Sequence, residues 1–314
     1  MAVGIGMNIS EVPALDLTGL SKTYGRRRGG VRAVQNVSLS VATGEVYGFL
    51  GPNGAGKSTT IRMLLSLISP SAGEIRLFGR DLRSESSVLR RVGSLVDGGS
   101  FYPFLSGRRN LEVLAKTHGG GFDRIDLLLD QVGLARDGGR KVKGYSTGMR
   151  QRLGVAAALL NDPDLVILDE PVNGLDAAGI QEMRALIRKL ASDEGKTVFL
   201  SSHLLHEVQQ VCDRVAIISK GEIVREATIA DLLRQDIGLR VEATPLDVAE
   251  AALSGRWRAE IDGSALRVEA TLAEAPEVVR RLVGASADVF GLAPEQRNLE
   301  QVFLSLTQPE ANDA

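Results

Sequence analysis

Short, nearly continuous apolar runs alternate with longer amphipathic stretches along the first two thirds of the chain. Three runs are rich in branched and aromatic residues, as strands buried on both faces of a parallel sheet are: "EVYGFLG" (45–51), "LVILDE" (165–170) and "TVFLSSH" (197–203). Three intervening stretches predict helices: "KSTTIRMLLSLI" (57–68), "RQRLGVAAALLND" (150–162) and "GIQEMRALIRKLASDEG" (179–195). The alternation predicts an α/β fold with a parallel sheet up to about residue 225.

The two ends of the chain have different patterns. Residues 14–45 predict short antiparallel strands joined by turns. After about residue 235 the order becomes β-α-β-β-α-β, with "IDGS" (261–264) as the central hairpin turn, which predicts a ferredoxin-like α+β unit. A last amphipathic helix is predicted over 298–307, with its apolar face formed by Leu299, Val302, Phe303 and Leu306. We therefore expect two domains, 12–235 and 236–314.

Composition restricts the class of protein. The chain has 314 residues, 44% of them hydrophobic and 24% charged, which is enough apolar material for two cores and argues against disorder. A net charge of −2 gives no general attraction to nucleic acid. The single cysteine, Cys212, excludes an internal disulfide framework, fits a reducing cytosol, and is expected to be a buried, inert thiol. With neither a signal peptide nor an apolar run of about 18 residues, membrane association is expected to go through a partner.

The three buried runs each end in polar residues, and strands of a parallel sheet present their carboxyl ends at one edge. The first run leads into "GPNGAGKST", Gly51 to Thr59, which fits G-x-x-x-x-G-K-[ST] between a strand and a helix. The glycines let backbone N–H groups converge on phosphate oxygens, while Lys57 can reach the β- and γ-phosphates and Ser58 can ligate Mg²⁺. A glycine-rich turn with an incidental lysine is the alternative, and the strand–helix context favours the P-loop.

The other two runs add carboxylates and a histidine. Asp169 ends the run "LVILD", where an unpaired carboxylate would be costly, so holding Mg²⁺ is its expected role. Glu170 follows, placed to orient or deprotonate the water that attacks the γ-phosphate. His203 ends the third run, and by itself such a histidine is more often structural than catalytic. At the same sheet edge as the P-loop it becomes a candidate to position the γ-phosphate.

The stretch "YSTGM", Tyr145 to Met149, resembles the LSGGQ signature of ATP-binding cassette (ABC) proteins. Ser146 and Gly148 keep the two key positions, and Thr147 and Met149 depart from the family's glycine and glutamine. Other family marks follow in order over roughly residues 14–230. Tyr24 in "LSKTYG" matches the aromatic that stacks on adenine, Asp176 ends a D-loop-like "NGLD", and His203 matches the switch histidine.

The resemblance implies an ABC-type nucleotide-binding domain with a parallel-sheet core, an antiparallel β-subdomain and a helical subdomain at about 98–162. In this family two domains pair head to tail, so a homodimer of this chain is expected, with the signature of one copy facing the P-loop of the other. Ser146 is expected to cap a helix there and to offer its hydroxyl and glycine N–H groups to a γ-phosphate. The residues expected to contact ATP are Tyr24, Gly51, Pro52, Asn53, Gly54, Ala55, Gly56, Lys57, Ser58, Thr59, Asp97, Ser146, Thr147, Gly148 and Asp176.

One position departs further from the family. Asp97 stands where the family usually has a glutamine that senses Mg²⁺ and nucleotide. A carboxylate could serve as a third metal ligand beside Ser58 and Asp169, or the substitution could be tolerated without any metal contact. An acidic residue here, before "FYPFLSGRRNL" (101–111), resembles the antibiotic- and lantibiotic-resistance exporters.

The resemblance implies the ATPase subunit of a drug or antibiotic exporter, on the cytoplasmic side of the cell membrane. It would bind ATP and Mg²⁺ and work with a separately encoded ABC-2-type permease. The segment Ser100 to Leu111, with Phe101, Tyr102 and Phe104, would either meet the permease or form a buried cluster. Two rival functions remain: a soluble ABC ATPase that acts on ribosomes or DNA, and a nucleotide-binding regulatory module without turnover. Glu170 and His203 argue against the second.

Overall fold

The structure is a computed structural model that describes residues 12–25, 29–96, 98, 100–234 and 237–296. These residues form two compact units that divide between Ala227 and Thr228, and each unit has its own hydrophobic core. Asp97 and the helix predicted over 298–307 lie outside the described residues.

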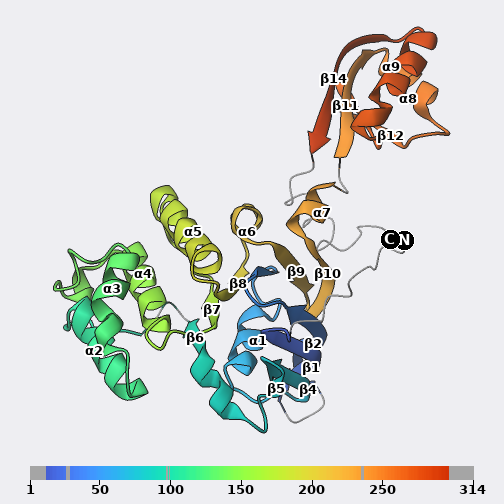
Figure 1. Ribbon diagram of the computed structural model, residues 1–314. Coiled ribbons are helices and arrows are strands. Elements are labelled where there is room, and N and C mark those ends of the chain that lie inside the picture. The colour runs from blue at the N-terminus through green and yellow to red at the C-terminus, as the bar shows by residue number, and fades with distance from the viewer. Residues whose placement is uncertain (1–11, 26–28, 97, 99, 235–236, 297–314) are drawn as a thin grey trace, which may run out of the picture. The chain divides into compact units, whose positions relative to one another are not determined.

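A six-stranded sheet in the order β10–β9–β3–β8–β7–β6 forms the centre of the first unit (Figure 1). Its strands are β3 (Val46–Leu50), β6 (Val92–Leu95), β7 (Leu165–Asp169), β8 (Thr197–Ser202), β9 (Arg214–Ser219) and β10 (Glu222–Thr228). The neighbouring pairs from β6 to β9 are parallel. Every residue of β3, β7 and β8 is buried, which confirms the three strands predicted from the apolar runs. Their carboxyl ends therefore meet at one edge.

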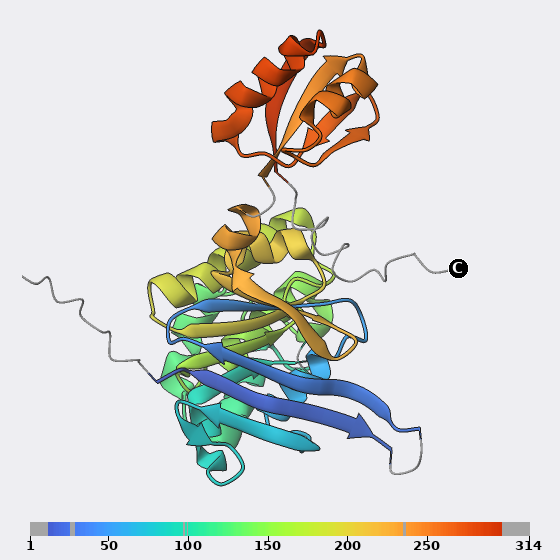
Figure 2. The ribbon, with the colours of Figure 1, turned by 90° about the vertical axis from the view of Figure 1, so that its right-hand side faces the viewer.

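A second, antiparallel sheet in the order β2–β1–β4–β5 confirms the strands expected near the N-terminus (Figure 2). Its strands are β1 (Leu15–Tyr24), β2 (Val31–Val41), β4 (Ala72–Leu77) and β5 (Arg80–Asp81). Helix α1 (Lys57–Leu64) shares one apolar core with both sheets. This helix is shorter than the predicted 57–68, because the backbone turns left-handed at Ser66, with φ 56°.

Helices α5 (Ala177–Ser192) and α6 (Leu205–Val211) pack against β3 and β8. Three further helices, α2 (Gly107–His118), α3 (Ile125–Gln131) and α4 (Thr147–Ala158), gather beyond β6, against which α4 packs (Figure 1). This group stands where a helical subdomain was expected. Short 3-10 helices lie at Ser86–Arg91, Phe122–Arg124, Val142–Gly144 and Leu272–Glu274, and helix α7 spans Ile229–Arg234.

The second unit contains one antiparallel sheet in the order β12–β13–β11–β14 and two helices. Its elements are β11 (Ile237–Thr244), α8 (Leu246–Leu253), β12 (Ala259–Asp262), β13 (Ala265–Val268), α9 (Ala275–Gly284) and β14 (Asp288–Gln296). Asp262 pairs with Ala265 across the turn, and Gly263 adopts φ 62°, as the predicted hairpin requires. Element order and strand order together confirm the ferredoxin-like split βαβ arrangement.

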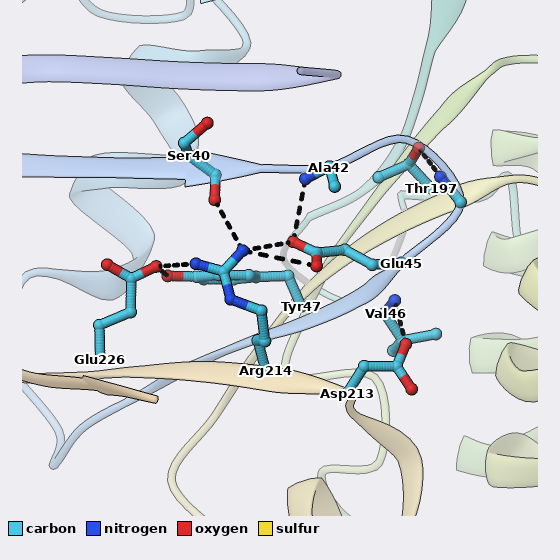
Figure 3. A network of polar contacts seen from close by, with 10 residues as sticks. Ser40, Ala42, Glu45, Val46, Tyr47, Thr197, Asp213, Arg214 and Glu226 are labelled. Carbon is cyan, nitrogen blue, oxygen red and sulfur yellow. Dashed lines mark hydrogen bonds and ion pairs between the residues drawn. The ribbon is translucent and has the colours of Figure 1, made fainter. Parts of the chain in front are cut away.

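A network of polar side chains ties together the starts of β3 and β9, the strand β10 and the end of β2 (Figure 3). The Arg214 guanidinium contacts Glu45 Oε1 at 3.2 Å, Glu226 Oε1 at 2.7 Å and the Ser40 carbonyl at 3.2 Å. The hydroxyl of the fully buried Tyr47 donates to the same Glu226 oxygen at 2.8 Å. The network therefore secures β3 at its beginning, while the P-loop follows its end.

Candidate functional site

The loop after β3 makes close backbone contacts that exclude side chains. A Cβ at Gly51 would lie 2.4 Å from the Ile218 carbonyl oxygen, and one at Gly56 would lie 2.5 Å from the Ala33 carbonyl oxygen. Gly56 also adopts φ 110°. Glycine is required at both positions, because any other residue would push the loop away from β2 and β9.

The loop ends at helix α1, where Gly56 is the N-cap and no side chain caps the helix. Uncapped N–H groups at a helix N-terminus attract anions such as phosphate. Lys57, the first residue of α1, is 5% exposed. Its ammonium donates to the Gly51 carbonyl at 2.8 Å and the Pro52 carbonyl at 3.3 Å. Its charge is thus held over the concave side of the loop.

Three predicted side chains come from the ends of β7 and β8, and one of them contacts Lys57. Glu170 follows β7, and its Oε1 lies 3.2 Å from the Lys57 ammonium. His203 follows β8, and its Nδ1 lies 2.7 Å from Glu170 Oε2. Asp169, the last residue of β7, is 7% exposed. The sheet thus brings together Lys57, Asp169, Glu170 and His203 as expected, and one carboxylate bridges the lysine and the histidine.

Lys57, Glu170 and His203 border a cavity of about 400 Å³, within the range of small-molecule sites, and Asp169 does not line it. Its lining consists of Ala33, Asn53, Gly54, Gly56, Lys57, Ser58, Thr59, Glu170, Asn173 and His203. The P-loop supplies more than half of these residues. The cavity therefore offers backbone donors and one cation on one side, and a carboxylate with a histidine on the other, which suits a bound triphosphate.

The signature-like strip lies elsewhere in the same unit. Ser146 is the N-cap of α4, and its hydroxyl accepts a hydrogen bond from the Met149 N–H at 3.2 Å, which confirms the predicted cap. Asp176 is the N-cap of α5 and accepts from the Gly179 N–H at 2.9 Å. Both helix starts border a second cavity of about 430 Å³, which also contains Thr147 and Gly148.

The two cavities have no lining residue in common. Each has a helix N-terminus directed at it, from α1 in one case and from α4 and α5 in the other. Within one copy, the strip from Ser146 to Gly148 is therefore not part of the cavity formed by the P-loop.

Several predicted nucleotide contacts do not line the first cavity: besides Ser146, Thr147, Gly148 and Asp176, these are Gly51, Pro52 and Ala55 of the P-loop and Tyr24. Tyr24 ends β1 and is 42% exposed, with Lys22 Nζ 5.3 Å from its ring centroid, and it does not line the cavity. Asp97 lies outside the described residues. The role of each stays a prediction.

Three residues that sequence reasoning missed belong to this region. Ala33 on β2 and Asn173 after β7 line the first cavity, and the buried Ser201 contacts both Asp169 and Glu170. Asn173 and Ser201 stand inside quoted motifs, "NGLD" and "FLSSH", whereas nothing in the pattern around Ala33 marks it. Which residues these three lie beside depends on the register of neighbouring strands, and the motifs do not predict that register.

The oxygen ligands that the protein offers would hold a magnesium ion only if a bound nucleotide supplied further ligands. Among the residues that the structure describes, no group of three histidine, cysteine or acidic side chains could enclose a metal. Ser58 and Asp169 would supply oxygen ligands, which Mg²⁺ prefers, and in phosphate-binding sites this ion takes its remaining ligands from phosphates and water. The residues present therefore fit Mg²⁺ bound together with a triphosphate.

Comparison with known proteins gives concordant results. The family model described as "ABC transporter" matches residues 34–173. An uncharacterised ABC transporter ATP-binding protein of Bacillus subtilis (strain 168) is 39% identical, over 94% of this chain and 96% of its own length. The bacitracin transport ATP-binding protein of Bacillus licheniformis is 39% identical, over 92% and 95%. The daunorubicin/doxorubicin resistance ATP-binding protein of Streptomyces peucetius is 36% identical, over 98% and 96%.

Solved structures agree in fold. A dimeric ATP-binding cassette, captured after hydrolysis with ADP and Pi, has a TM-score of 0.63 and 27% identity, over 68% of this chain and 98% of that one. No helix among the described residues is long and apolar enough to cross a membrane. Near-full-length relatives, the matched family model and the geometry of the P-loop cavity together show that the chain belongs to the ABC transporter family, as an ATP-binding protein with ATPase activity.

Proposed function

We propose that this chain is the ATPase subunit of a membrane exporter and that two copies complete each other's ATP sites. The observation that carries the proposal is the separation of the P-loop cavity from the signature cavity within one copy. A head-to-tail pair would bring the signature cavity of each copy against the P-loop cavity of the other. A two-fold homodimer is the simplest arrangement that does so.

Each composite site would divide the work between two chains. Lys57 and the P-loop N–H groups would hold the phosphates, and Ser58 and Asp169 would ligate Mg²⁺, which screens the phosphate charge when bound. Glu170 would accept a proton from the attacking water. His203, 2.7 Å from Glu170, would position the Glu170 carboxylate and the γ-phosphate. From the opposite chain, the α4 N-terminus with Ser146 and Gly148 would stabilise the negative charge. Tyr24 would stack on adenine.

A groove between the helical group and β6 supports a permease partner. This groove of about 400 Å³ is lined mainly by apolar side chains, among them Leu95, Phe101 and Leu114. Tyr102 and Phe104 beside it are exposed, and the buried Asn110 holds the Tyr102 backbone through two hydrogen bonds of 2.8 and 3.1 Å. A pinned loop that exposes two aromatics next to an apolar groove suits an apolar helix of a partner.

We therefore place the chain on the cytoplasmic face of the cell membrane, attached through an ABC-2-type permease. The substrate class proposed is a small amphiphilic drug or antibiotic. It rests on two relatives of nearly the same length, whose names state bacitracin transport and daunorubicin/doxorubicin resistance. Asp97 is proposed as a further Mg²⁺ ligand.

A mixed-dimer experiment tests the composite site. A Ser146→Arg chain and a Lys57→Ala chain, purified together through two different tags, would share one intact site and one doubly damaged site. We expect the mixed dimer to keep about half of the wild-type ATPase rate per dimer, while each mutant homodimer has none.

The matched control places both substitutions in one chain and pairs that chain with wild type. Both composite sites then carry one defect, so no ATPase activity is expected. Equal activity in the two mixed dimers would contradict the head-to-tail arrangement.

Export is tested in cells that express this chain with a candidate permease, the product of its neighbouring gene. Resistance to an amphiphilic antibiotic should rise with wild type and not with Glu170→Gln. Phe104→Glu should remove resistance while the purified variant keeps its ATPase activity, because Phe104 lies outside both ATP cavities. Unchanged resistance with Phe104→Glu would contradict the proposed permease contact.

A further inference from the structure

Ser201, on β8, contacts both acidic residues of the P-loop cavity region. It is fully buried, and the parallel register of β7 and β8 places it opposite Asp169. Its hydroxyl donates to Asp169 Oδ1 at 2.6 Å and accepts from the Glu170 N–H at 3.0 Å. One side chain thus links the carboxylate of one residue to the backbone of the next.

The link matters because Glu170 has an uncommon backbone conformation. Its φ is 51°, in the left-handed region that residues with a Cβ adopt rarely and at an energetic cost. The Glu170 N–H is held by Ser201, and the Glu170 carbonyl accepts from the Asn173 N–H at 3.1 Å. In this conformation the Glu170 side chain reaches both Lys57 and His203. A relaxed backbone at Glu170 would direct the carboxylate elsewhere.

The other two side-chain hydroxyls of β8 have different hydrogen-bond partners. The Ser202 hydroxyl accepts from the Leu204 N–H at 2.9 Å and donates to the Leu204 carbonyl at 3.4 Å. Thr197, at the opposite end of the strand, accepts from the Gly44 N–H at 2.9 Å. Of the three hydroxyls in this strand, Ser201 is the one that meets the acidic pair.

We propose that Ser201 is a positioning residue for ATP hydrolysis. Its hydroxyl, anchored on the Asp169 carboxylate, holds the strained Glu170 turn, so that Glu170 faces the site of the attacking water. The inference rests on the proposed role of Glu170 as the group that acts on that water. Ser201 itself touches no reacting atom, and its effect passes through Glu170.

The test is Ser201→Ala in the full-length chain. Misplacement of a catalytic group by about 1 Å can cost about a hundredfold in rate, so we expect kcat to fall by about 10- to 100-fold. Affinity for a fluorescent ATP analogue, measured without turnover, should stay within about twofold, because the P-loop is untouched. Thr197→Val is the matched control: it removes a buried hydroxyl from the far end of the same strand and should leave kcat unchanged.

A double-mutant cycle separates positioning from general destabilisation. In single-turnover measurements, adding Ser201→Ala to Glu170→Gln should cause no further loss of rate, because the residue that Ser201 positions is already disabled. Ser201→Ala overturns the inference if kcat stays at the wild-type level. The inference is also overturned if kcat falls only in proportion to the loss of folded protein, as measured by thermal unfolding. If Glu170→Gln itself turns over normally, the proposed role of Glu170 fails, whatever Ser201→Ala shows.

Discussion

Glu170 links the P-loop lysine to the histidine at the end of β8 through its two carboxylate oxygens. One oxygen meets the Lys57 ammonium and the other meets His203, at 3.2 and 2.7 Å. A bound triphosphate would compete for the same lysine. We therefore expect the charge of Glu170 to affect both the binding of ATP and its hydrolysis, and substitution can separate the two effects.

Glu170→Gln keeps the shape of the side chain and removes its ability to take a proton. We expect ATP turnover to fall by about 100- to 10,000-fold, the usual contribution of a general base. ATP binding should be preserved, because the Lys57 ammonium loses a competing carboxylate, and an ATP-bound dimer should accumulate on size-exclusion chromatography. Asp164→Asn, which removes an exposed carboxylate just before β7, serves as control and should hydrolyse ATP normally. Near-normal hydrolysis by Glu170→Gln would remove Glu170 from the base role.

Lys57→Ala removes the cation held over the P-loop. We expect the affinity for ATP to fall at least tenfold, because the phosphates lose a charge-assisted contact of about 1.5–3 kcal/mol. Lys196→Ala is the matched control. Lys196 is also a buried lysine, but it pairs with Asp162 at 2.7 Å just before β8 and should affect stability rather than binding. Equal ATP affinity of Lys57→Ala and wild type would contradict the P-loop assignment.

Strand β3 is connected differently at its two ends. At its end the chain turns into the P-loop, and at its start the polar network shown in Figure 3 attaches it to β9 and β10. The Tyr47 ring stacks against Phe199 of β8, with ring centroids 5.9 Å apart. Burial raises the pKa of the Tyr47 hydroxyl above its ordinary value, and the nearby Glu226 carboxylate raises it further.

The raised pKa predicts how stability depends on pH. Above about pH 10 an unfolded chain loses the tyrosine proton, whereas the folded chain retains it, so the free energy of unfolding decreases as pH rises. Tyr47→Phe cannot show this loss. We expect the variant to be about 1 kcal/mol less stable than wild type at pH 8, and this gap to close by about 1 kcal/mol between pH 9 and 11. Urea unfolding of both proteins measures the difference in their free energies of unfolding. A difference that does not change with pH would contradict the buried Tyr47–Glu226 contact.

The whole molecule consists of two units with separate cores, and each contains an intrinsic reporter. Cys212, the only cysteine of the chain, is 2% exposed in the first unit, and burial raises the pKa of its thiol. Trp257, the only tryptophan, is in the core of the second unit, where its ring N–H donates to Glu274 at 3.1 Å. The two residues can therefore follow the two units independently.

We expect nucleotide to stabilise the first unit alone. At 100 times the dissociation constant, ATP should add about 2.7 kcal/mol, and labelling of Cys212 by a thiol reagent should slow by about a hundredfold. Glu170→Gln is the chain to use, since it does not consume the ligand. The thermal midpoint followed by Trp257 fluorescence should not move. A common shift of both signals would show that the two units unfold as one.

Local patterns were enough to predict three central strands and to place four candidate site residues at one edge of their sheet. Full burial on both faces made β3, β7 and β8 recognisable as continuous apolar runs, and parallel strands must present their ends at one edge. The P-loop could be recognised because a tight phosphate-binding turn needs glycines at fixed spacing, and Lys57, Asp169, Glu170 and His203 followed from that edge. The split βαβ order of the second unit was likewise readable from its strands and its hairpin turn.

Other features were decided only by the tertiary structure, because they depend on which segments lie side by side. The contact of Ser201 with Asp169 follows from the register of two strands that are 32 positions apart in sequence, and no local pattern encodes a register. The separation of Ser146 from the P-loop cavity likewise arises from the packing of α4 beyond β6. Sequence by itself determined which chemical groups this protein has; packing determined which of them meet within one copy.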